Sequence, residues 1–274
     1  MTDPSDVGRA HPAYGRLRQV TATAAVLLCD NPGQMTLDGT NTWILRAPGS
    51  DELVVLDPGP DDPEHLARIA ALGKVALTLV SHRHGDHTDG LERHRELTGS
   101  PVYAVDPAFR TADGGGLAHG QEFSVAGVEL EVLATPGHTA DSVSVLLRGT
   151  GADDPGAVLT ADTVLGRGTT VLDPQDGDLG DYLDSLDLLI DRGAGRMCLP
   201  GHGPELPDTA AVATHYRAHR RERLDQVRAA LDTLGADADV ADVVADVYRD
   251  VDPSLWGAAR WSVEVQLRYL RERG

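Results

Sequence analysis

One nine-residue segment constrains this chain more than any other. Between Ser81 and Asp89 it reads Ser-His-Arg-His-Gly-Asp-His-Thr-Asp, directly after an apolar run from Val75 to Val80. Imidazole and carboxylate together suit zinc or a neighbouring first-row metal. A short loop leaving a buried strand turns alternate side chains toward one ion. The pattern therefore predicts a metal site at a strand end, with four candidate ligands: His82, His84, Asp86 and His87.

The same segment indicates a second ion. His82 and His84 are two positions apart, so in an extended segment their side chains point to the same side and can converge on one metal. Asp86 and His87 follow the turn at Gly85 and can reach another metal. Four ligands from one loop exceed what a single catalytic zinc takes while keeping an open position.

Three later segments repeat one design, in which an apolar run ends in a short turn that presents a single His or Asp. This repetition favours a metal site over the alternative that the histidines lie on a solvated loop. The segments are Thr135–Thr139, Leu159–Thr163 and Leu199–Gly203, and the residues that they present are His138, Asp162 and His202.

The order of these motifs resembles the metallo-β-lactamase superfamily over about residues 20–205. The resemblance implies that His82, His84 and His138 hold one metal. It also implies that Asp86, His87 and His202 hold the second, and that Asp162 bridges the two. The best-known zinc β-lactamases carry Cys where this chain has Asp162, so the resemblance points to the glyoxalase II and phosphodiesterase side of the superfamily rather than to antibiotic hydrolysis.

The chemistry expected of such a centre is hydrolysis. Two zinc ions, with manganese or iron as alternatives, lower the pKa of a bridging water from about 16 to about 7 and act as Lewis acids. Asp86 is predicted to be catalytic because it can orient the resulting hydroxide. The chain has no Gly-x-Ser-x-Gly elbow that would supply a protein nucleophile.

Other residues near the motifs are candidates for supporting or substrate-binding roles. Asp57, in a Leu-Asp-Pro-Gly-Pro turn, either supports the metal loop or caps the turn. Asn41, Thr139, His219 and Arg220 are predicted to contact substrate, although Thr139 is equally suited to a turn. His94 is expected on the surface of a helix.

The fold class indicated is α/β, with two sheets between helices in an αββα sandwich. Residues 1–205 are predicted to form the metal domain and residues 206–274 a small helical domain, where strands stop and helical patterns follow. Together with the Thr36–Trp43 stretch, this arrangement resembles the lactamase-β-like protein 2 subgroup, which implies a winged-helix-like C-terminal unit. The expected strands are 20–28, 41–46, 53–56, 75–80, 102–105, 128–133, 143–147 and 157–159, and the expected helices 63–72, 89–97, 178–190, 208–234, 240–248 and 253–271.

Composition limits the compartment and the partners. The 274 residues carry a formal net charge of −19, which repels polyanions unless a basic patch or metals offset it. Only two cysteines, Cys29 and Cys198, are present, both in apolar runs, so they are predicted to be small core residues of a protein in a reducing compartment. No apolar stretch is long enough for a signal peptide or a membrane span. A cytoplasmic protein without membrane contacts is therefore expected.

The motifs indicate the reaction class better than the substrate. We favour an ester or thioester, either a small molecule or an acyl group on a carrier. The first alternative is an endoribonuclease or phosphodiesterase on single-stranded RNA, since arginines cluster between Arg217 and Arg228. A solvated helix face that pairs with acids explains that cluster equally well. A non-catalytic metal-bound binding module and an iron oxidoreductase are the remaining alternatives.

Overall fold

We describe the protein from a computed structural model, which covers residues 13–151, 154–250, 252 and 256–273. Contacts within the chain divide it into two compact units, residues 1–132 with 200–204, and residues 133–199 with 205–274. The domain boundary predicted after residue 205 rests on the change from strand to helical patterns in the sequence, not on contacts, and it stays a prediction.

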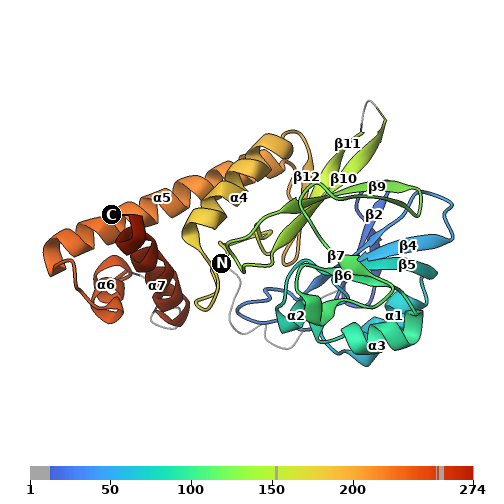
Figure 1. Ribbon diagram of the computed structural model, residues 1–274, viewed down its shortest axis with the longest axis horizontal. Helices are drawn as coiled ribbons and strands as arrows, with labels where there is room; N and C mark the ends of the chain where they lie inside the picture. The colour runs from blue at the N-terminus through green and yellow to red at the C-terminus, as the bar shows by residue number, and fades with distance from the viewer. Residues whose placement is uncertain (1–12, 152–153, 251, 253–255, 274) are drawn as a thin grey trace. The chain divides into compact units, whose positions relative to one another are not determined.

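The first unit contains a seven-stranded sheet in the order β1-β2-β3-β4-β5-β6-β7. Its first four strands pair antiparallel, and β4 to β7 pair parallel (Figure 1). Strands β8 and β9 follow and pair antiparallel. The strands are β1 (Leu17–Gln19), β2 (Ala24–Leu28), β3 (Asn41–Leu45), β4 (Glu52–Leu56), β5 (Lys74–Leu79), β6 (Val102–Ala104), β7 (Gly115–Gly116), β8 (Glu122–Val125) and β9 (Val128–Ala134).

Helix α1 (Pro63–Ala70) covers part of this sheet. It begins after Asp62, whose carboxylate accepts hydrogen bonds from the next free backbone amides, and proline at its first position has no amide to satisfy. Leu66 and Ile69 of α1 are buried in one cluster with the strand residues Ala25, Leu27, Ile44, Leu53, Val55 and Val75. This packing fixes β4 and β5, the strands whose ends carry the predicted site.

Two further helices, α2 (Gly85–Thr88) and α3 (Leu91–Thr98), follow β5, and a short 3-10 helix spans Pro107–Phe109. The expectation that His94 lies on the surface of this region is wrong. Its ring is fully buried in α3 and its Nε2 lies 2.9 Å from Thr78 Oγ1 on β5. The polar pattern of this short helix indicates exposure, because the sequence does not show that Thr78 on the neighbouring strand is a hydrogen-bond partner for the His94 ring.

The second unit is built around helix α4 (Leu179–Arg192) and the hairpin of β10 (Val143–Gly151) and β11 (Asp154–Ala161). Tyr182, Leu186 and Leu189 on one face of α4 are buried with Leu146 and Val158 of the hairpin. Strand β12 (Met197–Pro200) carries Cys198, whose thiol is buried, and burial raises its pKa to about 12. Cys29 of the first unit is also buried and free, so both cysteines are core residues as predicted.

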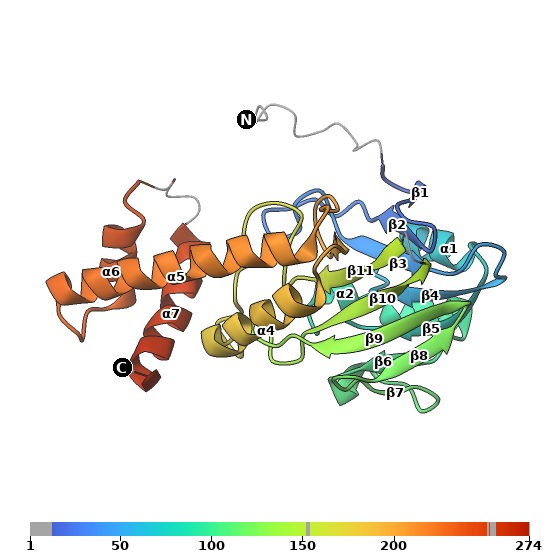
Figure 2. The same ribbon diagram turned by 90° about the horizontal axis from the view of Figure 1, so that it is seen from above.

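Three helices complete the second unit: α5 (Thr209–Leu234), α6 (Val240–Val247) and α7 (Trp256–Arg273). Figure 2 shows α6 and α7 beside the far half of the long α5, where Val227 and Ala230 are buried with Val243, Val263 and Leu267. The described residues after 205 form no named strand, so a wing stays a prediction. The predicted start of the last helix at Pro253 lies outside the described residues. None of the described helices combines the length and the apolar composition that crossing a bilayer requires.

Candidate metal centre

Three predicted ligands meet in the first unit. One ligand atom each from Asp86, His87 and His202 lies within 4.8 Å of the others. His202 Nε2 is 3.0 Å from Asp86 Oδ2 and 3.3 Å from His87 Nε2, although these residues are far apart in sequence. An antiparallel bridge between Thr40 and His202 brings the distant turn to the start of β3. The structure therefore joins this part of the predicted set at one point.

The outer nitrogens of both imidazoles contact acceptors. His87 Nδ1 lies 2.9 Å from Asp57 Oδ2, and His202 Nδ1 lies 3.0 Å from the Gly39 carbonyl oxygen. Because these acceptors hold each hydrogen on Nδ1, the lone pairs on the two Nε2 atoms point toward each other and toward the Asp86 carboxylate. With both rings neutral, three electron-rich atoms face one point and repel one another, and a bound metal cation would remove that repulsion as a shared proton also can. The donor set thus fits a metal ion.

His82 and His84 form a second group in the same unit. His82 Nε2 lies 3.1 Å from His84 Nδ1, in agreement with the predicted convergence of the pair. Ser81 links them to Asp57, because its hydroxyl donates to Asp57 Oδ2 at 2.6 Å and lies 2.9 Å from His82 Nδ1. Since the Ser81 hydrogen is directed to the carboxylate, its oxygen accepts from His82, and His82 also presents a lone pair on Nε2.

Asp57 connects both groups. Its carboxylate accepts from the Ser81 amide at 2.8 Å and from the Ser81 hydroxyl, and it contacts His87. The residue is buried, and its φ of 57° places it in the left-handed region that non-glycine residues seldom adopt. Of the two readings of Asp57, support of the metal loop agrees with these contacts.

The second unit holds the other two predicted ligands. His138 Nε2 lies 3.7 Å from Asp162 Oδ2, and both side chains are largely buried. His138 Nδ1 lies 2.6 Å from the Val171 carbonyl oxygen, which again places the hydrogen on the outer nitrogen and the lone pair toward the carboxylate. The pair presents the same chemistry as the ligands of the first unit.

The predicted substrate residues make contacts within the protein. Asn41 Nδ2 donates to the carbonyls of Pro200 and Gly203, so it holds the turn that carries His202. Thr139 is buried and its hydroxyl contacts Asp141 and Ser142. Arg220 is also buried. Burial and neighbouring arginines lower the pKa of His219. These contacts do not support direct contact with substrate, which stays a prediction for Asn41, Thr139, His219 and Arg220.

Several supporting groups had no signal in the sequence. The carbonyls of Gly39 and Val171 belong to the backbone, which every residue has, so no side-chain pattern reveals them. Ser81, in contrast, directly precedes the first histidine of the motif, so its hydroxyl is visible in the sequence as a possible partner of that ring.

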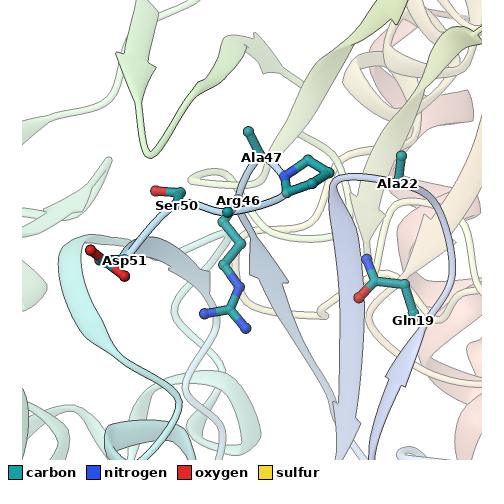
Figure 3. Close-up of a pocket in the computed structure, with 8 residues that line it drawn as sticks. Gln19, Ala22, Arg46, Ala47, Ser50 and Asp51 are labelled. Carbon is teal, nitrogen blue, oxygen red and sulfur yellow. The ribbon is translucent and has the colours of Figure 1, made fainter.

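A polar pocket of about 490 Å³ lies elsewhere on the first unit, between the turn after β1 and the turn after β3 (Figure 3). Arg46 and Asp51 supply its charged groups, and Arg46 Nη1 donates to the Leu72 carbonyl at 3.0 Å. Strand β3 begins at Asn41, beside the His202 turn, and ends at Leu45, beside this pocket. The pocket is therefore at the opposite end of β3 from the predicted ligand His202.

Comparisons with known proteins agree with this geometry. The family model described as "Metallo-beta-lactamase superfamily" matches residues 35–202. The Beta-lactamase-like protein 2 homolog of Drosophila melanogaster is 29% identical, covering 96% of this chain and 91% of the relative. The Atrochrysone carboxyl ACP thioesterase of Aspergillus chevalieri is 32% identical, covering 82% and 70%.

Solved structures confirm the predicted fold class. A Beta-lactamase domain protein from Burkholderia ambifaria has a TM-score of 0.78 at 20% identity, covering 97% of this chain and 92% of that one. A metallo-beta-lactamase family protein from Thermus thermophilus has a TM-score of 0.72 at 21% identity, covering 93% and 95%. This chain belongs to the metallo-β-lactamase superfamily.

Proposed function

We propose that this superfamily hydrolase uses two divalent metal ions to cleave an ester or thioester. The observation that carries the proposal is the convergence of His87 Nε2, His202 Nε2 and Asp86 Oδ2, with each imidazole hydrogen directed outward. A bound metal cation would offset the repulsion among these electron-rich atoms. Asp86, His87 and His202 would hold one ion.

The second ion would be held by His82, His84 and His138, with Asp162 shared by both. The family order of the motifs supports this assignment, as does the lone-pair orientation in each group. Imidazole nitrogens and carboxylate oxygens suit zinc, and manganese and iron bind the same types of ligand. When bound, two such ions lower the pKa of a shared water and polarise the scissile carbonyl.

The protein's own residues would then orient the reactants. Asp86 is the best-placed acceptor for a proton of the nucleophile, because its Oδ2 lies among the ligand nitrogens while the side chain stays about a quarter exposed, at 27%. Asp57 would keep His87 basic by accepting its outer hydrogen. These assignments make Asp86 the catalytic residue and Asp57 a positioning residue.

The contacts that the clustered arginines make within the protein favour an ester or thioester over RNA as substrate. Arg217 pairs with Asp187, Arg228 pairs with Asp225 at 2.8 Å, and Arg223 lies over the ring of Tyr248. Tyr216, the aromatic residue nearest the cluster in sequence, is buried, and the half-buried ring of Tyr248 is covered by Arg223. Phosphate binding needs available cations, of which exposed Arg221 is one, and base stacking needs exposed rings. The thioesterase among the relatives supports an acyl group on a carrier as substrate.

Parallel turnover assays on one sample test the proposal. Acyl thioesters, esters, a bis-aryl phosphodiester and labelled single-stranded RNA would be offered to the zinc-loaded wild type and to Asp86→Asn. We expect thioester or ester cleavage that falls at least about a hundredfold in Asp86→Asn. Asp61→Asn, at an exposed carboxylate that pairs with Arg93, is the matched control. Cleavage of RNA alone, or bound metal without turnover of any substrate, would contradict the proposal.

A further inference from the structure

Arg220 lies on α5 with only 4% of its surface exposed. Its guanidinium donates to the Thr170 carbonyl and stands over the ring of Tyr182, with 5.1 Å from Cζ to the ring centroid. A buried guanidinium loses its hydration, so its retention inside a protein requires strong compensating contacts. A loop carbonyl and an aromatic face offset part of the cost of burying Arg220, whose Nε is buried without a hydrogen-bond partner among the described residues.

The loop that Arg220 holds also holds two predicted metal ligands. Thr170 Oγ1 donates to the Asp162 carbonyl at 2.8 Å. The next carbonyl along the loop, that of Val171, accepts from His138 Nδ1 at 2.6 Å. The Asp173 amide donates to the His138 carbonyl at 2.9 Å. The short segment from Thr170 to Asp173 therefore sets both the main chain and the ring of His138, and the main chain of Asp162.

Other contacts of the second unit hold the chain before and after this segment. The Tyr182 hydroxyl donates to the Thr163 carbonyl at 2.7 Å, next to Asp162. Arg268 of α7 donates to the Gly177 carbonyl. Between these points, Arg220 supplies the side-chain contact to the Thr170 carbonyl. Loss of the guanidinium would leave that carbonyl without its cationic partner and allow the segment to move.

We propose that Arg220 is a positioning residue for the metal ligands His138 and Asp162, acting through Thr170 and Val171, so that helix α5 helps to build the metal centre. The inference rests on the proposed metal-dependent function. It gives the C-terminal helices a role that needs no nucleic acid. Contacts that orient a metal ligand from outside typically account for 10- to 100-fold in affinity. Arg220 acts one contact further away, so we expect about a tenfold loss.

The test is Co²⁺ titration of the metal-free protein, followed by visible absorption and by competition with a chelator. Arg220→Met keeps the apolar stem and removes the charge, and Arg220→Lys keeps the charge with a different donor geometry. Arg228→Met, on the same helix with an exposed side chain, is the matched control. We expect Arg220→Met to bind one ion about tenfold more weakly with an altered spectrum, Arg220→Lys to lie between, and Arg228→Met to match the wild type.

The thermal midpoint of each metal-free variant separates positioning from general stability. A lower midpoint in the Arg220 variants with an unchanged Co²⁺ spectrum and affinity would overturn the inference, because a merely structural role predicts that result. If Arg220→Met does not fold, Arg220→Lys decides by the same criteria. A wild type that binds no metal would overturn the proposed function and the inference together, whereas a wild type with two ions and unaffected Arg220 variants would overturn the inference alone.

Discussion

His87 Nδ1 and Asp57 Oδ2 lie 2.9 Å apart, with both side chains almost completely buried. The carboxylate directs the ring nitrogen that faces Asp86 and His202, and it also holds Ser81, next to His82. A single buried carboxylate thus sets the orientation of the loop that carries the first four predicted ligands.

Asp57→Asn is expected to weaken metal binding 10- to 100-fold, because an amide is a poorer acceptor and leaves His87 less basic. Chelator competition with zinc-loaded protein measures the loss. Asp61→Asn removes an exposed carboxylate that pairs with Arg93, and it serves as the control. Equal zinc affinity in Asp57→Asn and the wild type would show that Asp57 does not support the ligands.

Asn41→Ala is expected to lower the free energy of unfolding by about 2 kcal/mol, because it leaves the Pro200 and Gly203 carbonyls without their amide donor. Urea unfolding measures this change, with exposed Gln175→Ala as control. Steady-state kinetics on the same samples tests the competing reading. A higher KM at unchanged stability would instead make Asn41 a substrate contact.

Gly137→Ala is expected to destabilise the turn before His138. Gly137 has a φ of 126°, and an added Cβ would lie 2.4 Å from the Tyr182 backbone. Strain and overpacking together cost about 2–4 kcal/mol. Gly195→Ala is the matched control, since its φ is 72° but nothing lies within 4 Å of the added atom, so only about 1 kcal/mol is expected. Equal losses in urea unfolding would contradict the predicted clash.

Acid is expected to destabilise the metal-free fold through His65 and His94. Burial lowers the pKa of both rings to about 4, with a further lowering of His94 by His65. Between pH 6.5 and 4 the unfolded chain binds protons that the folded chain does not, so the free energy of unfolding falls as pH falls through this window. Above pH 6.5 both states are neutral and the contribution is constant.

The size of this acid effect is about 3 kcal/mol for each ring at most. Urea unfolding of metal-free wild type and His94→Gln at pH 7, 6 and 5 isolates the contribution of His94, because the other histidines are common to both. We expect a shallower pH dependence in the variant. Parallel pH profiles for the two proteins would mean that His94 does not titrate in this window.

Sequence reasoning predicted most elements to within a few residues because apolar periodicity and Gly or Pro turns mark their ends. It predicted the strand before the metal loop as 75–80, and β5 spans Lys74–Leu79. It missed the short strands β1, β7, β8 and β12, in which neighbouring strands rather than local pattern decide the pairing. It also missed the burial of Arg220, because a charged residue within a basic helix gives no sign of the Thr170 carbonyl beside it.

The measurement closest to the central claim is zinc titration of metal-free protein, with bound metal and thioester turnover followed on the same sample. The account predicts that turnover rises until two zinc ions are bound per chain and then stays constant. Full turnover with one ion, or none of the offered acyl substrates cleaved with two ions bound, would contradict it.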